Sequence, residues 1–255
     1  MVERDGTEKR GRLSRPQVLE AAVALVDREG LGALTMRRLA TELGVESMAL
    51  YRYTPGKEAL LDGLTEAYFT EVNARLRTSA ASGPRRPERH HPERRRPEPQ
   101  QPEWRQELRR IARAFAEVAH AHPEILPLVA TRPLTVPVTR RPAPVLELTE
   151  HILAVLGRAG FDDPTALTVY RAFVAWNLGC LLVDKRQVVD NPEEPDPALR
   201  LGLHRLSAAE YPRLRALVPR FADFDDDDEM LRGLDSLLDG MPQPPLDAFY
   251  GGDAS

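Results

Sequence analysis

Apolar side chains recur every three or four residues along most of the chain, which is the spacing of amphipathic helices. The first such segment covers residues 14–29, and its apolar face consists of Val18, Leu19, Ala22, Leu25 and Val26. Ser14 suits the N-cap of this helix, Pro16 suits its first turn, and Gly30 ends it. The pattern therefore predicts a first helix over these residues.

Three more helices are predicted before residue 80. The second begins after Thr35, whose hydroxyl can cap the free N–H groups of the first turn, and it stops at Gly44. The third follows a short turn and covers residues 46–53, and the fourth covers residues 57–77. The fourth helix is long enough to connect two domains.

Helical periodicity resumes at Trp104 and recurs over residues 145–160, 164–185 and 227–241. The sequence lacks any alternation of apolar and polar residues bounded by turn signals, so it predicts an all-α fold. Between the two helical halves, residues 79–102 are rich in Pro, Arg and Glu and hold almost no apolar side chain beyond alanine. Such a segment cannot bury enough surface to offset chain entropy, which predicts a disordered loop.

The composition indicates a soluble protein. Hydrophobic residues make up 42% of the chain and charged residues 29%, and no apolar run approaches the roughly 20 residues of a membrane span. The first residues are charged and lack an apolar stretch, which argues against a secretory signal, and the one cysteine, Cys180, cannot form an internal disulfide. We therefore expect a cytoplasmic location.

The charge balance gives no general affinity for nucleic acid. The net charge is -4, and residues 1–60 hold ten basic and nine acidic side chains. Binding to DNA would therefore depend on basic side chains gathered on one face and on the arm that carries Lys9, Arg10, Arg12 and Arg15.

Ala40, Gly44 and Leu50 have the relative spacing of a helix-turn-helix motif. A small residue lets the two helices cross closely, glycine tolerates a left-handed turn, and leucine fills the space between the helices. An ordinary helical hairpin inside a bundle shares these features. The spacing alone therefore leaves DNA binding and plain packing as alternatives.

The residues around this motif favour DNA binding. The segment ALTMRRLATELGVESMALYRYTPGKEALLDGL, with the preceding SRPQVLEAAVALVDREG, resembles the N-terminal domain of the tetracycline-repressor (TetR) family nearly position by position. This resemblance implies that the third helix enters the major groove of DNA. The residues that it implies as DNA contacts are Thr35, Met36, Arg37, Ser47, Met48, Ala49, Tyr51, Arg52, Tyr53 and Lys57.

Arg37 matches a position that reads a guanine in the tetracycline-repressor branch of the family. A bidentate contact from its guanidinium to O6 and N7 contributes about 1 to 3 kcal/mol of discrimination. The alternative is a solvated surface arginine. Thr35 and Lys57 match positions that contact the phosphate backbone, and such contacts orient the protein without specifying sequence.

The C-terminal half resembles the same branch. The segments PEWRQELRRIARAFAEVAHAH, TRP at residues 131–133, NLGCLLVD and LRGLDSLLDGM occur in the order found there. In that branch the helices that hold the last two segments form a four-helix interface with a second copy, which implies a homodimer. The implied interface residues are Leu178, Leu181, Leu182, Leu234, Leu237 and Leu238. Packing within one chain predicts the same apolar pattern.

The resemblance also implies a small-molecule effector pocket between the fourth helix and the C-terminal helices. Its implied lining is Tyr68, Asn73, Phe115, Leu128, Arg132, Tyr170, Phe173, Trp176 and Asn177. Aromatic walls with a few polar groups are usual for pockets, although aromatic residues at helical spacing also form plain core. The family histidine that binds drug-chelated magnesium has no counterpart near Leu128 and Val129. We therefore expect no metal, no cofactor and no tetracycline-magnesium complex.

Together these patterns divide the chain into a flexible basic arm (1–13), a helix-turn-helix DNA-binding domain (14–60), a connecting helix (61–78), the loop (79–102), an effector-binding and dimerisation domain (103–242) and a flexible tail (243–255). The implied function is a repressor that a largely apolar or aromatic effector releases from a palindromic operator. A regulator that responds to a partner protein, or to no ligand, is the alternative. The sequence shows no nucleophile-base spacing, phosphate-binding glycine loop or metal-ligand cluster, which argues against an enzyme.

Overall fold

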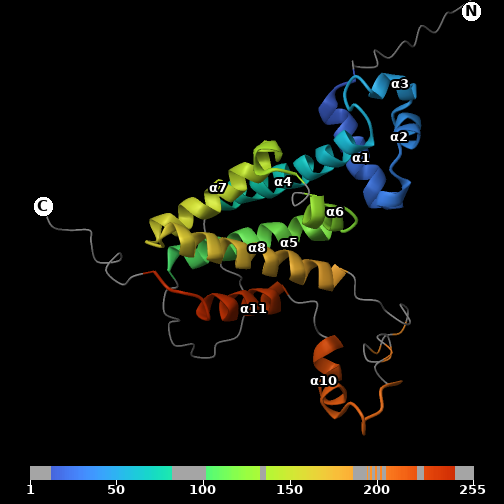
Figure 1. Cartoon of the computed structure of the whole chain (residues 1–255). Helices are drawn as coiled ribbons and strands as arrows, with labels where there is room; N and C mark the ends of the chain where they lie inside the picture. Colours follow the sequence, from blue (N-terminus) through green and yellow to red (C-terminus); the bar gives the residue numbers. More distant parts are fainter. Residues whose placement is uncertain are drawn as a thin grey trace, which may run out of the picture.

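The structure is a computed structural model that describes residues 13–81, 102–132, 136–185, 205–222 and 227–244, with single residues 194, 196, 199 and 202. Every regular element in these ranges is helical, so the prediction of an all-α fold is confirmed. Figure 1 shows a small group of helices at one end of a larger bundle, with one long helix reaching into both.

The small group, which we call the head, contains α1 (Arg15–Glu29), the short 3-10 helix η1 (Leu31–Ala33), α2 (Met36–Leu43) and α3 (Ser47–Leu50). Ser14 caps α1 as predicted, and it forms a full capping box because Gln17 Oε1 accepts the Ser14 N–H at 2.9 Å. Thr35 caps α2 as predicted, since its hydroxyl accepts the N–H of Arg38 at 3.1 Å. Local capping therefore sets where the first two helices begin.

The larger bundle, which we call the body, contains α5 (Glu103–Ala121), α6 (Leu126–Thr131), α7 (Ala143–Arg158), α8 (Asp163–Lys185) and α11 (Asp227–Asp239). The long helix α4 (Lys57–Ala81) packs against α1 of the head and against α5, α6 and α7 of the body. A short 3-10 helix, η3 (Val138–Arg140), precedes α7, and α10 (Pro212–Ala222) lies apart from the bundle in Figure 1. The head and the body therefore share one continuous helix.

α1 crosses α4 at close range. A Cβ atom added to Gly63 of α4 would lie 2.3 Å from Cδ2 of Leu19 on α1, which is far inside van der Waals contact. Leu19 is buried, and so are Leu60 and Leu64 on either side of the glycine. The glycine thus allows a leucine to fill the space that a side chain would occupy.

Several predicted boundaries were wrong. The third helix is shorter than residues 46–53, because α3 ends at Leu50 and a turn follows in which the N–H groups of Tyr53 and Thr54 both donate to Leu50 O. The fourth helix is longer than predicted, and residues 79–81, expected in the loop, belong to α4. Outside the described residues lie most of the predicted loop (82–101), most of the predicted arm (1–12) and most of the predicted tail (245–255).

α8 corrects the expectation that no apolar run reaches membrane-spanning length. By length and composition alone, Asp163–Val183 could cross a membrane, and it is the one such helix in the part of the chain that the structure describes. It packs against α5, α6, α7 and α11 of the bundle, yet 28% of this window is buried. Leu167 and Val183 are its exposed large apolar side chains, whereas Val174, Leu178 and Leu182 are partly buried against the core.

Candidate functional site

The helix-turn-helix geometry follows from the three residues that predicted it. Gly44 ends α2 with φ 64° and ψ 35°, in the left-handed region that favours glycine. The turn is closed by the N–H of Val45, which donates to Ala40 O at 3.0 Å. Ala40 and Leu50 are buried between the helices. The motif therefore places α3 on the surface beside α2.

Two large apolar side chains of this motif face solvent. Met48 is 73% exposed on α3, and Tyr51, one turn later, is 47% exposed. Neither residue packs into the head, whose core already includes Leu50. Exposed apolar side chains of this size are typical of a binding surface rather than of packing. Their exposure therefore makes the outer face of α3 a candidate binding surface.

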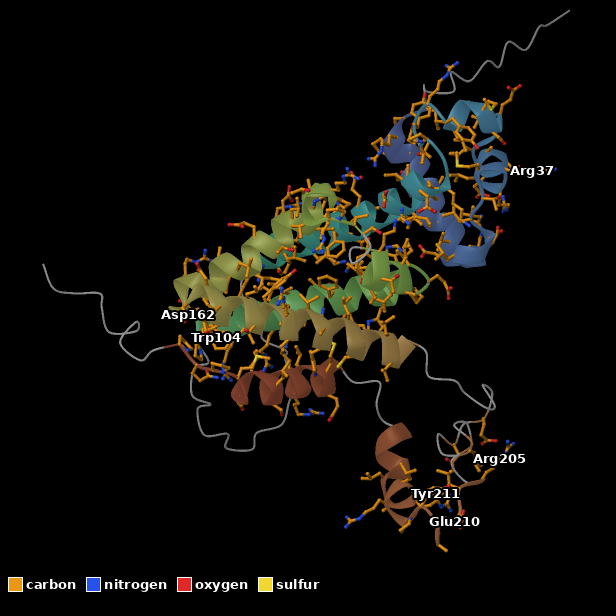
Figure 2. The ribbon with its side chains drawn as sticks, in the orientation of Figure 1. Arg37, Trp104, Asp162, Arg205, Glu210 and Tyr211 are labelled. Carbon is orange, nitrogen blue, oxygen red and sulfur yellow. The ribbon has the colours of Figure 1, made fainter. Side chains whose placement is uncertain are left out.

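The other predicted DNA-contact residues fall into two groups. Thr35, Arg37, Arg52 and Lys57 are exposed on the surface, and Figure 2 shows Arg37 on the outer side of α2, pointing away from the body. Partial burial is shared by the remaining four, which are Met36, Ser47, Ala49 and Tyr53. Met36 and Tyr53 pack against the hydrophobic core, so part of each side chain is committed to the head itself.

Ion pairs inside the head neutralise other arginines, which the sequence did not reveal. Arg38 binds Glu29 at 2.5 Å and Glu42 at 3.0 Å, and Arg28 binds Glu42 at 2.9 Å. The hydrogen bonds from Arg38 hold the pKa of Glu29 below its ordinary value. On α1, Arg15 pairs with Glu66 of α4 at 2.6 Å.

These pairs separate the engaged arginines of the head from three exposed cations. Arg37, Arg52 and Lys57 have no ion-pair partner among the described residues, whereas the acidic side chains named above are used internally. Unpaired cations beside an exposed helix are what a phosphate backbone attracts. The net charge of the head therefore does not show which of its cations are free to contact phosphate.

In the body, the predicted pocket residues lie on four helices and differ in burial. The buried ones are Tyr68, Asn73, Phe115, Leu128, Phe173 and Asn177. The ring of Tyr68 lies 6.0 Å from that of Phe115, and Phe69, which the sequence reasoning missed, lies 5.6 Å from Phe115. Burial raises the pKa of Tyr68. An aromatic cluster from α4 and α5 therefore fills part of the body.

The buried polar groups are not equally satisfied. The Tyr68 hydroxyl donates to Phe115 O at 3.4 Å, and the Asn73 amide donates to Pro144 O at 3.0 Å. Tyr170, which is partly buried, shares a hydrogen bond of 3.2 Å with Thr149. Asn177 on α8 differs, because it is 2% exposed and its Oδ1 has no hydrogen-bond partner. Among the described residues, buried side-chain atoms of Thr54 and Trp104 also lack a hydrogen-bond partner. A buried acceptor without a donor is costly, which makes Asn177 a candidate for a polar contact with a bound molecule.

Two predicted pocket residues make contacts of another kind. Arg132 binds Asp62 at 2.6 Å and Glu58 at 2.8 Å, both near the start of α4. Trp176 lies against α11, since a Cβ atom at Gly233 would be 3.0 Å from its ring. These contacts tie α6 to α4 and α8 to α11.

The predicted dimer residues also divide by burial. Leu181, Leu234 and Leu238 are buried within a single copy, so they belong to its own core. Leu178, Leu182 and Leu237 are partly buried at its edge. Farther along α8, Val183 is 68% exposed.

Comparison with known proteins gives the same assignment for both halves. A family model described as "Bacterial regulatory proteins, tetR family" matches residues 18–64, and one described as "Tetracyclin repressor-like, C-terminal domain" matches residues 96–243. The tetracycline repressor protein class A from transposon 1721 of Escherichia coli is 28% identical over 90% of each chain. HTH-type transcriptional repressor DrrR1 of Streptomyces coeruleorubidus is 32% identical over 60% of this chain, which spans 46% of that protein.

A solved structure supports the arrangement of the helices. The crystal structure of a possible TetR family transcriptional regulator from Streptomyces coelicolor A3(2) has a TM-score of 0.68 at 26% identity, over 89% of this chain and 98% of that one. The resemblance therefore extends from the motif to the whole succession of helices.

The exposure of Met48 predicts a separation of stability from binding. Met48→Ala should change the free energy of unfolding by less than about 0.5 kcal/mol, as exposed substitutions do, while it weakens binding to DNA. Leu50→Ala, at a fully buried position, should lower the free energy of unfolding by about 2 to 5 kcal/mol. Urea unfolding and a gel-shift titration measure the two effects. Equal destabilisation by both variants would mean that Met48 is a packing residue.

Proposed function

The chain belongs to the TetR family of transcription regulators, which are not enzymes, and from this membership we propose how it binds DNA, senses an effector and dimerises. The protein is a DNA-binding transcriptional repressor of the cytoplasm, where it reaches the bacterial chromosome. The observation that carries the proposal is the outer face of α3, with exposed Met48 and Tyr51, together with exposed Arg37 on α2.

α3 enters the major groove, where Met48 offers an apolar contact to a thymine methyl group. Arg37 reads a guanine from the start of α2, and Lys57 contacts the phosphate backbone at the start of α4. The four residues of α3 reach only a few base pairs. Two copies on a palindromic operator, one helical turn apart or a multiple of it, are therefore needed for specificity.

The body binds a small, largely apolar or aromatic molecule that donates a hydrogen bond to Asn177 Oδ1. Support comes from the burial of this unpartnered oxygen and from the aromatic side chains of Tyr68, Phe69 and Phe115. The effector favours one of two conformations of the dimer and acts only through its differential affinity for them. Binding favours the conformation in which the two α3 helices no longer match successive major grooves.

A second copy covers the uncovered apolar surface of α8. The partly buried Leu178, Leu182 and Leu237, with the exposed Val183, supply a surface that one copy leaves open. Exposed apolar patches of this kind mark interaction sites. The interface lies on α8 and α11, and it sets the spacing of the two heads.

Operator binding is tested by incubating the purified chain with fragmented genomic DNA and sequencing what is retained. Wild type should enrich a palindrome, and a variant that combines Arg37→Ala with Tyr51→Ala should lose the enrichment, since a bidentate arginine alone contributes about 1 to 3 kcal/mol. Arg158→Ala, which removes an exposed arginine at the end of α7, is the matched control. No enriched sequence with wild type would contradict the DNA-binding proposal and favour a regulator that needs a partner protein.

Effector binding is tested with Asn177→Leu and a panel of polycyclic aromatic compounds that carry phenol or amide N–H donors. Compounds that raise the melting temperature of wild type should bind the variant about fivefold more weakly, the effect of one lost hydrogen bond. The unliganded variant should melt at the same temperature or higher, because it no longer buries an unpartnered oxygen. Unchanged affinity for every active compound would exclude Asn177 from the effector site.

Dimerisation is tested by Val183→Glu, which places a charge on exposed α8 surface. Light scattering on a gel-filtration column should show a smaller species for this variant than for wild type, because burying an unpaired carboxylate at the interface is unfavourable. Val138→Glu alters a similarly exposed valine on η3 and should leave the mass unchanged. A variant that keeps the wild-type mass would place the interface elsewhere.

A further inference from the structure

His122 lies where the head, α4 and the body meet. It follows α5 as the C-cap residue, and its backbone N–H donates to Val118 O at 2.8 Å. Its side chain is 18% exposed. Three residues later the chain turns into α6, as the N–H of Ile125 donates to His122 O. The imidazole is thus fixed to the corner between two helices of the body.

Both ring nitrogens of His122 face carboxylates on other helices. Nδ1 lies 2.7 Å from Oδ2 of Asp27 on α1, and Nε2 lies 2.9 Å from Oε2 of Glu71 on α4. Ionised carboxylates only accept hydrogen bonds, so both nitrogens must donate. A neutral imidazole has one N–H, whereas the imidazolium has two. The geometry is therefore satisfied by the charged form of the ring.

We propose that His122, as an imidazolium, is the positioning residue that holds the head on the body and fixes the orientation of α3. This role rests on the proposed function, because orientation matters when two heads must meet two half-sites. Loss of the proton leaves one ring nitrogen with its lone pair toward a carboxylate, which releases either α1 or α4. Operator affinity then falls, since a head held to the body by fewer contacts loses more orientational freedom on binding.

Further charged groups surround the two carboxylates that face His122. α1 contributes Asp27, and α4 contributes Glu71, which is shared with Arg75 at 2.6 Å. Arg75 also binds Glu117 of α5 at 3.1 Å. Burial opposes ionisation of Glu71, but the hydrogen bonds from Arg75 and His122 keep its pKa below the ordinary value.

The loop after α5 adds a further carboxylate. Glu124 reaches α1 at Gly30, because a Cβ atom on that glycine would lie 3.6 Å from Glu124 Oε2. His122 and Glu124 therefore both lie against the end of α1, and both belong to the turn between α5 and α6.

His120 provides a matched control two residues away. Its Nδ1 lies 2.7 Å from Ala116 O, within its own helix. It therefore joins no second element through that bond, although it shares the helix end and the residue type with His122. A variant at His120 changes the same number of titratable groups without touching the contact between head and body.

The test compares wild type, His122→Gln and His120→Gln as full-length chains at about pH 6 and about pH 8.5, which bracket the ordinary titration of histidine. The urea midpoint of wild type should exceed that of His122→Gln at the lower pH, and the gap should close at the higher pH as the imidazolium loses its proton. His120→Gln should follow wild type. Asp27→Asn, which keeps the histidine, serves as a second variant and should also flatten the pH profile.

A second measurement uses the genomic fragment that wild type enriches most. Its affinity for wild type and His120→Gln should fall about fivefold across the same pH range, the smallest usual size of a coupling between sites, and should stay nearly constant for His122→Gln. The proposed role of His122 is wrong if the difference in urea midpoint is equal at both pH values. It is also wrong if His120→Gln gives the same pH profile as His122→Gln. A pH-dependent midpoint with parallel affinity profiles overturns the positioning role. The urea measurement needs no DNA. Failure of the His122 proposal can therefore be distinguished from failure of the DNA-binding proposal.

Discussion

The close crossing of α1 and α4 is the constraint on which the arrangement of the molecule depends. Gly63 leaves room for Leu19, so the axis of α1 is held against the one helix that continues into the body. Close packing fixes geometry well because a well-packed interface deforms little. Any shift of α4 caused within the body is therefore passed to the head, and to α3, without a flexible link between them.

Polar contacts restrain the same joint around this apolar crossing. Arg15 binds Glu66 near the start of α1, His122 binds Asp27 near its end, and Arg132 holds the first turns of α4. The pair of Arg15 is largely exposed and contributes little to overall stability, whereas the side chains of His122 and Arg132 are 18% and 16% exposed. Each pair restrains a different contact of this joint, since Arg15 connects α1 to α4, His122 connects the end of α5 to α1, and Arg132 connects α6 to α4. A repressor needs such connections if occupancy of the body is to change the spacing of two recognition helices.

Much of the head could be predicted from sequence because its determinants are local. Ser14 and Thr35 cap the helices that follow them, and Gly44 is required by the backbone at the turn. The extent of α3 and the presence of α6 and α10 were missed, since short helices carry weak periodicity and α6 begins beside Pro127. In the body, the unpartnered oxygen of Asn177 and the two acceptors around His122 depend on residues far apart in sequence. Periodicity shows that a side chain is buried, but it does not show which groups surround it.

The internal pairing of Arg28 and Arg38 with Glu29 and Glu42 has a consequence for the time that the protein spends on random DNA. Non-specific binding comes from phosphates neutralised by free cations, and each one contributes about 0.9 to the salt exponent of affinity for duplex DNA. Because glutamates already engage these arginines, few cations on residues 13–81 remain for such contacts. Residues 13–81 therefore add few salt-sensitive contacts to random DNA, which limits how strongly bulk chromosome competes for the head.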